Sequence, residues 1–253
     1  MENPIQLPII VRRPFRIIAH RGASAYAPEN TRAAFQLAVA MGAEDIELDV
    51  QLSADHQVVV CHDPTLERYG HPGRIDTLSW PQLAQFDMGS WFSPYLFRGE
   101  KLLRLRDLFE TYGAKITYHI ELKGASDPLP RHVCRLIADF QLQGRTVITS
   151  FSFEALQQVK AISPSLRLGW LIRNIDENAL AKAQALELFQ LCPRADLLTD
   201  QAVGLAHTVV HEVRAWGIHG NREEILALIL KILDIGCDGT TLDWPDWILH
   251  SAQ

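Results

Sequence analysis

The chain has 253 residues, 47% of them hydrophobic and 21% charged, a composition typical of soluble globular proteins. Its 24 basic and 30 acidic residues give a formal net charge of −6. No run of Lys or Arg provides the electropositive track that a nucleic-acid backbone requires, so we exclude nucleic acid as a partner. A small phosphate ester needs only local positive charge. The length suits one large α/β domain.

The cysteines and the apolar segments bear on where the protein is found. The four cysteines lack C-x-x-C spacing, which predicts reduced, mostly buried thiols and a cytoplasmic location; they are Cys61, Cys134, Cys192 and Cys237. In the first 14 residues the charges follow the apolar stretch instead of preceding it, so we predict no signal peptide. The most hydrophobic helix-like segment, Ile225 to Leu233, is shorter than the roughly 20 residues of a membrane span. No integral membrane segment is therefore predicted.

Short β-branched runs alternate with helix-like segments along the chain. Strands are predicted at Phe15–His20, Ile46–Val50, Val58–Cys61, Ile116–Leu122, Thr146–Thr149, Leu168–Ile172, Leu197–Thr199, Val213–Trp216 and Gly239–Leu242. Helices are predicted at Asn30–Met41, Pro128–Gln141, Phe153–Ala161, Glu177–Phe189 and Arg222–Ile235. Asn30 and Thr31 are a plausible cap of the first helix and Gly42 a plausible stop. About eight β/α units without the Rossmann glycine fingerprint favour a (β/α)8 TIM barrel over an open sheet.

One interval interrupts this alternation. Residues 64–105 are rich in Gly, Pro and aromatic residues and are too numerous for a plain loop. We expect one barrel domain over residues 1–253, with this segment inserted as a small cap over the barrel mouth. Its aromatic residues either line a wall for a choline, ethanolamine or lipid group or form the core of the cap, and we favour the core; they include Trp80, Trp91, Phe92 and Tyr95.

Three acidic residues lie on apolar runs. Side chains alternate between the faces of a strand, so Glu47 and Asp49 point the same way, into the barrel. Their like charges would resist ionisation in a sheltered pocket unless a cation lay between them. Glu121 repeats the pattern in a second strand, and three carboxylates suit one hard divalent cation, Mg²⁺ or Ca²⁺, with Mn²⁺ as a further possibility. The alternative is an edge strand with ordinary surface carboxylates.

Basic residues accompany these acids. His20 and His62 each close an apolar run, where barrel enzymes place reactive groups, and two imidazoles can serve as acid and base. Arg21 and Lys123 can bind phosphate oxygens. The alternatives are a structural hydrogen-bonding role for each histidine, and salt bridges to the acidic cluster for Arg21 and Lys123.

These residues, taken in order, resemble a known family. The matching motifs are His20-Arg21-Gly22, Pro28-Glu29-Asn30-Thr31, Glu47-Leu48-Asp49-Val50, His62-Asp63, Glu121-Leu122-Lys123, Ser150-Phe151, Trp216 and Asp243-Trp244-Pro245-Asp246. They resemble the glycerophosphodiester phosphodiesterases, and the likeness runs through nearly the whole chain from Ile17.

The resemblance implies a barrel that hydrolyses glycerophosphodiesters, small-molecule substrates, to sn-glycerol 3-phosphate and an alcohol with a divalent cation. It implies His20 and His62 as the acid/base pair, and Glu47, Asp49 and Glu121 as metal ligands. Arg21 and Lys123 would hold phosphate, while Phe151 and Trp216 would line the glycerol side of the pocket. In the family's proposed route the substrate's own 2-hydroxyl attacks phosphorus, and water later opens the cyclic phosphate.

Two other functions stay open at this stage. One is a phospholipase D-like cleavage of lysophospholipids or sphingomyelin, since that family resembles this one in its barrel, histidines and carboxylates. The other is a degenerate barrel that only binds phosphate or a partner protein. The oligomeric state and the leaving alcohol are not predicted.

Overall fold

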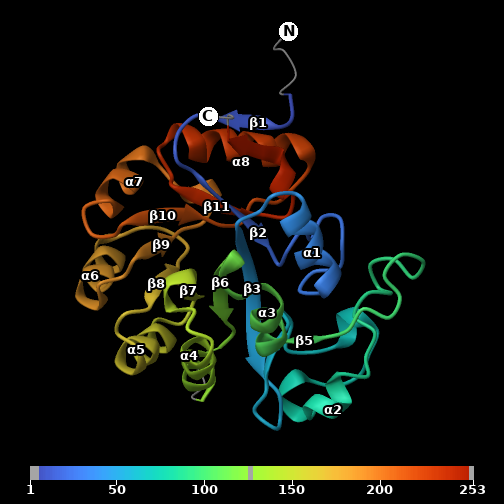
Figure 1. Cartoon of the computed structure of the whole chain (residues 1–253). Helices are drawn as coiled ribbons and strands as arrows, with labels where there is room; N and C mark the ends of the chain where they lie inside the picture. Colours follow the sequence, from blue (N-terminus) through green and yellow to red (C-terminus); the bar gives the residue numbers. More distant parts are fainter. Residues whose placement is uncertain (1–5, 125–127, 251–253) are drawn as a thin grey trace.

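The computed structural model describes residues 6–124 and 128–250, and its centre is a closed ring of eight parallel strands (Figure 1). The strands are β2 (Arg16–His20), β3 (Asp45–Leu52), β6 (Thr117–Leu122), β7 (Thr146–Ser150), β8 (Arg167–Leu171), β9 (Gln190–Cys192), β10 (Glu212–Ala215) and β11 (Gly239–Leu242). They follow one another around the ring in sequence order, and β2 pairs with both β3 and β11, which closes the sheet. The predicted (β/α)8 barrel is confirmed.

Helices surround this ring. They are α1 (Arg32–Ala40), α3 (Leu105–Tyr112), α4 (Leu129–Asp139), α5 (Phe153–Ile162), α6 (Glu177–Leu186), α7 (Asp200–Ala206) and α8 (Arg222–Asp234), with short 3₁₀ turns η3 (Gly113–Lys115), η4 (Gln143–Arg145) and η5 (Ala195–Leu197). After β11 the described chain continues into η6 (Pro245–Trp247) and β12 (Ile248–His250). Strand β12 pairs in parallel with β1 (Ile9–Val11), so the first and last described strands lie together.

The helix predicted at Asn30–Met41 is α1, with one of its two predicted cap residues and its predicted stop. Thr31 is its N-cap and accepts a hydrogen bond from the backbone N–H of Ala34. Gly42 follows the C-cap with φ +89°, a conformation that glycine adopts without strain. Helix α1 thereby fixes the connection between β2 and β3, the two strands on which the first of the predicted site residues lie.

The predicted strand at Leu197–Thr199 is wrong. The strand of this unit is β9, Gln190–Cys192, whereas Leu197 ends η5 and Thr199 caps α7 by accepting from the N–H of Ala202. The preceding helix was predicted to reach Phe189, but α6 ends at Leu186 and Glu187 takes a left-handed conformation, φ +51°. Leu188 and Phe189 continue the helical pattern of apolar residues in the sequence, although in the structure they connect α6 to β9.

Strand β4 (Val58–Val60) exists as predicted but is not a barrel strand. It runs antiparallel to the far end of β3, with Val60 opposite Val50, and β5 (Leu103–Arg104) pairs antiparallel with β4. Strand β3 therefore extends beyond the ring, and β4 leads the chain back toward the barrel. This reversal brings His62 to the site from the direction opposite to the barrel strands.

Residues between β4 and β5 have a small core of their own. Three short helices, η1 (Glu67–Tyr69), η2 (Ile75–Thr77) and α2 (Trp80–Leu83), lie in this stretch, at the side of the barrel in Figure 1. Its buried side chains include Leu66, Tyr69, Ile75 and Leu83, and Trp80 and Trp91 pack against them. Two of the four predicted aromatic residues thus contribute to this core, while Tyr95 is 94% exposed.

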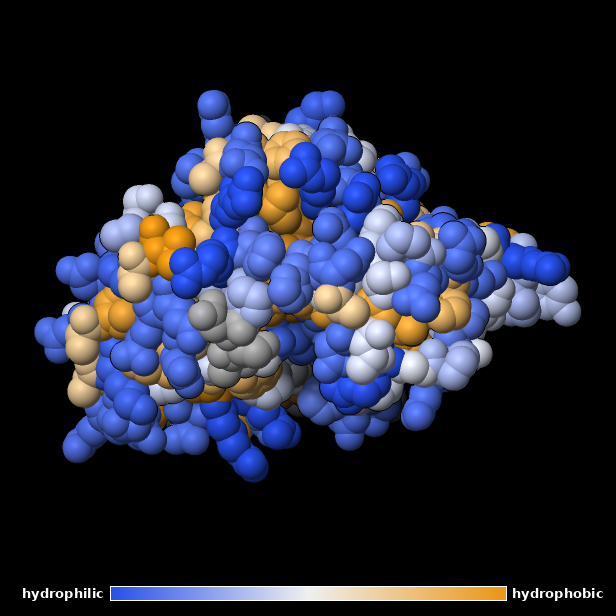
Figure 2. Space-filling model, turned by 90° about the horizontal axis from the view of Figure 1, so that it is seen from below, coloured by the Kyte–Doolittle hydropathy of each residue, from blue (hydrophilic) through white to orange (hydrophobic). Residues whose placement is uncertain are grey.

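The molecular surface carries no broad apolar area on the face in Figure 2, where hydrophobic residues occur as small patches among hydrophilic ones. In residues 6–124 and 128–250, no helix is both long enough and apolar enough to cross a membrane. The four cysteines are free and buried, as predicted.

Candidate active site

A cavity of about 250 Å³ is lined by residues from the barrel strands and from the loops that follow them. Eight of the nine predicted site residues line it: His20, Arg21, Glu47, His62, Glu121, Lys123, Phe151 and Trp216. The ninth, Asp49, is completely buried and lies against Glu47 and Glu121. The structure therefore brings together all nine residues, although they are spread over almost 200 positions of sequence.

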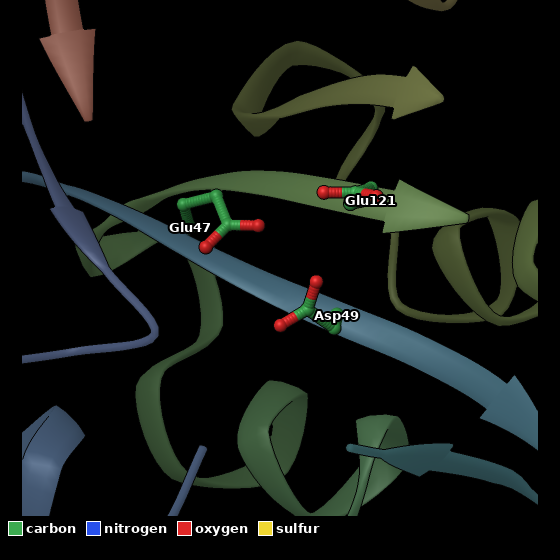
Figure 3. A group of neighbouring side chains, drawn as sticks. All are labelled: Glu47, Asp49 and Glu121. Carbon is green, nitrogen blue, oxygen red and sulfur yellow. The ribbon is translucent and has the colours of Figure 1, made fainter. Parts of the chain in front are cut away.

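The three predicted carboxylates converge from two neighbouring strands (Figure 3). Strands β3 and β6 pair in parallel with Asp49 opposite Glu121, and Glu47 lies two residues earlier on the same face of β3. One oxygen from each side chain lies within 4.8 Å of the others. The alternative of a solvent-facing edge strand is wrong, because β3 pairs on both sides and Glu47 is only 3% exposed.

The charges in this cluster are unequal. Burial, together with the charge of Asp49, raises the pKa of Glu47 above its usual range. The pKa of Asp49 is lowered in spite of burial, because Arg21 and Lys123 stabilise its charged form. Crowding of acids in a sheltered place is thus partly relieved by neighbouring cations.

Arg21 and Lys123 both form ion pairs with acids of the site. An Arg21 Nη lies 2.9 Å from Glu29, and its Nε lies 3.1 Å from Asp49. The Lys123 Nζ lies 2.8 Å from Glu121 and 3.2 Å from Asp49. These contacts confirm the alternative predicted for the two cations, which is pairing with the acidic cluster. Such pairing is compatible with an additional role in binding phosphate.

A tight turn places Arg21 at the end of β2. Arg21 and Gly22 both have positive φ, +57° and +84°, and the backbone N–H of Arg21 donates to Glu47 at 3.1 Å. A Cβ on Gly22 would lie 2.6 Å from the carbonyl carbon of Ala34. Gly22 is required by this close approach of the turn to helix α1, as well as by its φ.

Each predicted histidine is held by a carboxylate at Nδ1. His20 Nδ1 lies 2.5 Å from Asp243, and His62 Nδ1 lies 2.6 Å from Asp63. Burial and the charge of Arg21 oppose a charged His20, but the hydrogen bond with Asp243 and the charge of Glu47 prevail and raise the pKa of His20. Nε2 of His20 lies 3.9 Å from a carboxylate oxygen of Glu47, so the imidazole ring lies between the carboxylate cluster and Asp243.

Two polar residues that sequence reasoning did not assign to the site support it directly. Asn30, predicted as a helix cap, has φ +58° and donates its amide to Asp49 at 2.9 Å, while Thr31 caps the helix. Gln51 donates to the backbone carbonyls of Cys61, His62 and Asp63 at 2.9, 3.1 and 2.9 Å. The first could have been suspected from its place beside Glu29 in a motif, whereas Gln51 gives no signal in sequence.

Phe151 and Trp216 form an apolar side of the cavity. Their rings meet edge to face, with centroids 5.1 Å apart. The indole N–H of Trp216 donates to the carbonyl of Ile172 at 3.0 Å, which fixes the ring. The cavity therefore has one charged side and one aromatic side, a combination suited to a small ligand with an anionic and a neutral part.

Comparisons with known proteins agree with this geometry. Residues 20–247 match the model of the glycerophosphoryl diester phosphodiesterase family. A glycerophosphodiester phosphodiesterase of Caldanaerobacter subterraneus subsp. tengcongensis is 30% identical, over 94% of this chain and 97% of its own. The human lysophospholipase D GDPD3 is also 30% identical, over 62% of this chain and 51% of its own.

A solved structure shows the same architecture. An Oleispira antarctica phosphodiesterase in complex with the product sn-glycerol-3-phosphate superposes with a TM-score of 0.79 and 27% identity, over 91% of this chain and 94% of its own. Family match and fold thus point the same way, and the match spans the whole cavity. The chain belongs to the glycerophosphoryl diester phosphodiesterase family and is an enzyme that hydrolyses glycerophosphodiesters.

Proposed function

We propose that the enzyme is metal-dependent and releases sn-glycerol 3-phosphate and an alcohol by acid/base catalysis with His20 and His62. The observation that carries this proposal is the convergence of Glu47, Asp49 and Glu121 beside two carboxylate-held imidazoles in one cavity. The product of the Oleispira antarctica enzyme supports the same chemistry for this chain.

The donor set fits one hard divalent cation. Three carboxylates with oxygens within 4.8 Å of one another suit Mg²⁺, Ca²⁺ or Mn²⁺, since the cluster contains no Cys or His ligand. Oδ1 of Asp49 is buried with the Lys123 ammonium 3.2 Å away, and the raised pKa of Glu47 reflects burial and repulsion that a cation would relieve. When bound, the ion would withdraw charge from the phosphoryl oxygens.

The two histidines are arranged for proton transfer. Because Nδ1 of each ring meets a carboxylate, Nε2 is the nitrogen left to exchange a proton with the substrate. One imidazole would accept the proton of the attacking hydroxyl, and the other would give a proton to the leaving alkoxide. Asp243 and Asp63 would hold the rings in the required orientation.

Substrate binding would divide between the two sides of the cavity. Arg21 and Lys123 lie on the charged side and would bind the phosphate while still contacting the acids. Phe151 and Trp216 would hold the carbon skeleton of the glycerol. We also propose that the chain is a single domain of residues 1–253, in which residues 64–105 act as a cap. Residues 1–5, 125–127 and 251–253 of this domain lie outside the described part. We further propose a cytoplasmic location, because the four cysteines are free, buried thiols.

Substrate comparison tests the activity. We expect glycerophosphocholine to be cleaved to sn-glycerol 3-phosphate and choline, and lysophosphatidylcholine to be cleaved more slowly, because a cavity of about 250 Å³ offers little room for an acyl chain. The likeness to a human lysophospholipase D makes this second substrate the one to compare. Cleavage of the lysolipid alone would contradict the proposal in favour of the phospholipase D-like alternative.

A histidine variant tests the mechanism. We expect His62→Ala to lower kcat by about 10²- to 10⁴-fold with the fold retained, since it removes one of the two proton-transfer groups. His211→Gln, an exposed histidine outside the cavity, is the matched control and should keep its rate. Near-normal turnover by the folded His62→Ala enzyme would exclude this residue as acid or base.

A further inference from the structure

A buried arginine lies at the floor of the same cavity. Arg214 is in the middle of β10, two residues before Trp216, and therefore about 7 Å deeper along the barrel. Its neighbours Val213 and Ala215 face the surrounding core, whereas Arg214 lines the cavity. It is only 2% exposed.

The guanidinium of Arg214 has no countercharge at ion-pair distance in residues 6–124 and 128–250, where no carboxylate lies within 4.0 Å of it. Its Nε is buried without a hydrogen-bond partner. The side chain that interacts with it is Cys192, and burial raises the pKa of this thiol, which therefore stays neutral. A buried guanidinium left in this state is costly unless a ligand completes its surroundings.

The other two cations of the cavity differ in this respect. Arg21 and Lys123 each contact two carboxylates at 3.2 Å or less. Glu47 and Glu121 act on Arg214 only through their longer-range charge. Arg214 is thus the cation of the cavity with the largest unused capacity to donate hydrogen bonds to an anion.

We propose that Arg214 is a further substrate-binding residue, which donates hydrogen bonds to phosphate oxygens from the floor of the cavity. This inference rests on the proposed function, in which a phosphate is the anion that enters the cavity. The planar guanidinium matches the spacing of two phosphate oxygens, so one group can hold both the diester and the phosphate monoester product. Recognition from below, together with Arg21 and Lys123 on the side of the carboxylates, would surround the phosphate.

Two variants test this role in the intact protein. Arg214→Met removes the charge and keeps an unbranched side chain, and Arg214→Lys keeps the charge without the planar fork. We expect Arg214→Met to raise KM for glycerophosphocholine and to weaken calorimetric binding of inorganic phosphate and of sn-glycerol 3-phosphate, each by about ten- to a hundredfold. Arg214→Lys should recover part of both losses, with a smaller change in kcat. Arg167→Met, an arginine outside the cavity, is the control.

The binding measurement separates this role from charge balance in the carboxylate cluster. If Arg214 acted only on the cluster, Arg214→Met would bind Mg²⁺ or Ca²⁺ more tightly and bind phosphate as the wild type does, and that result would overturn the inference. If Arg214→Met did not fold, unchanged phosphate affinity in Arg214→Lys would overturn it equally. Phosphate binding that depends on Arg214, in an enzyme whose turnover survives complete removal of divalent ions, would instead keep the inference and refute the proposed function.

Discussion

Asp243 holds His20 across the seam at which the barrel closes. His20 ends β2, Asp243 directly follows β11, and the two strands are hydrogen-bonded neighbours. The Oδ1–Nδ1 distance is 2.5 Å, and Ser24 donates to the same carboxylate oxygen at 3.0 Å. The first and last strands of the ring must therefore pair correctly for this imidazole to be oriented.

Asp243→Asn should lower kcat by about 10²-fold or more while leaving KM nearly unchanged. The amide keeps the shape of the carboxylate, but its NH₂ group can favour the wrong tautomer of His20. Steady-state kinetics with glycerophosphocholine measure the effect. Asp238→Asn, which alters a His–Asp pair of 2.7 Å away from the cavity, is the matched control. A change in kcat of less than threefold in Asp243→Asn would show that His20 does not depend on this contact.

Gln51→Leu should reduce kcat by about tenfold, because three hydrogen bonds that fix the backbone on either side of His62 are lost. Leucine has a similar size, so the packing of β3 should be preserved. The loss of kcat should be accompanied by faster amide hydrogen exchange of residues 61–63, because their backbone is no longer fixed. Slower turnover with unaltered exchange in this segment would point to a different cause.

Removal of divalent ions should abolish turnover. We expect EDTA treatment to leave less than about 1% of the activity, and Mg²⁺ or Ca²⁺ to restore it, because three clustered carboxylates would otherwise repel the phosphate. Glu121→Gln should weaken the affinity for the restoring ion. Full activity in thoroughly stripped protein would contradict the assignment of these carboxylates.

Gly22→Ala should destabilise the fold by about 2–3 kcal/mol, as measured by urea unfolding. Alanine at φ +84° is strained, and its Cβ would also lie 2.6 Å from the backbone of Ala34. Gly42→Ala separates the two effects, since Gly42 has a similar φ of +89° but nothing within 4 Å of a Cβ. It should lose only about 1 kcal/mol. Equal losses in both variants would mean that the close approach to Ala34 has no cost.

Part of the carboxylate cluster could be predicted from sequence because strand periodicity places Glu47 and Asp49 on the same face of one strand. Adjacent parallel strands then place Asp49 opposite Glu121. His62 shows the limit of the same reasoning. The apolar run before it predicts a strand correctly, but strand direction depends on pairing with β3, and that is a long-range contact without a local signal.

Supporting residues were missed for a related reason. Asn30 has a residue type and a position typical of a helix cap, and only the fold shows that its amide donates to Asp49, 19 residues away. In the sequence Arg214 is a single charged residue in a short predicted strand, which gives no sign that it is buried. Its burial results from the closure of the ring of strands around it. The strand β9 escaped prediction because three residues carry too little periodicity to be separated from the end of helix α6.

The antiparallel return of β4 makes one part of this enzyme exchangeable. Because β4 and β5 pair with each other and with the overhanging end of β3, the ring closes without them. Natural variation, or a designed graft, can therefore replace residues 70–102, which follow His62, Asp63 and η1, without altering the hydrogen bonds of the barrel. Such an exchange would leave every residue that lines the cavity in place, since none of them lies between positions 70 and 102.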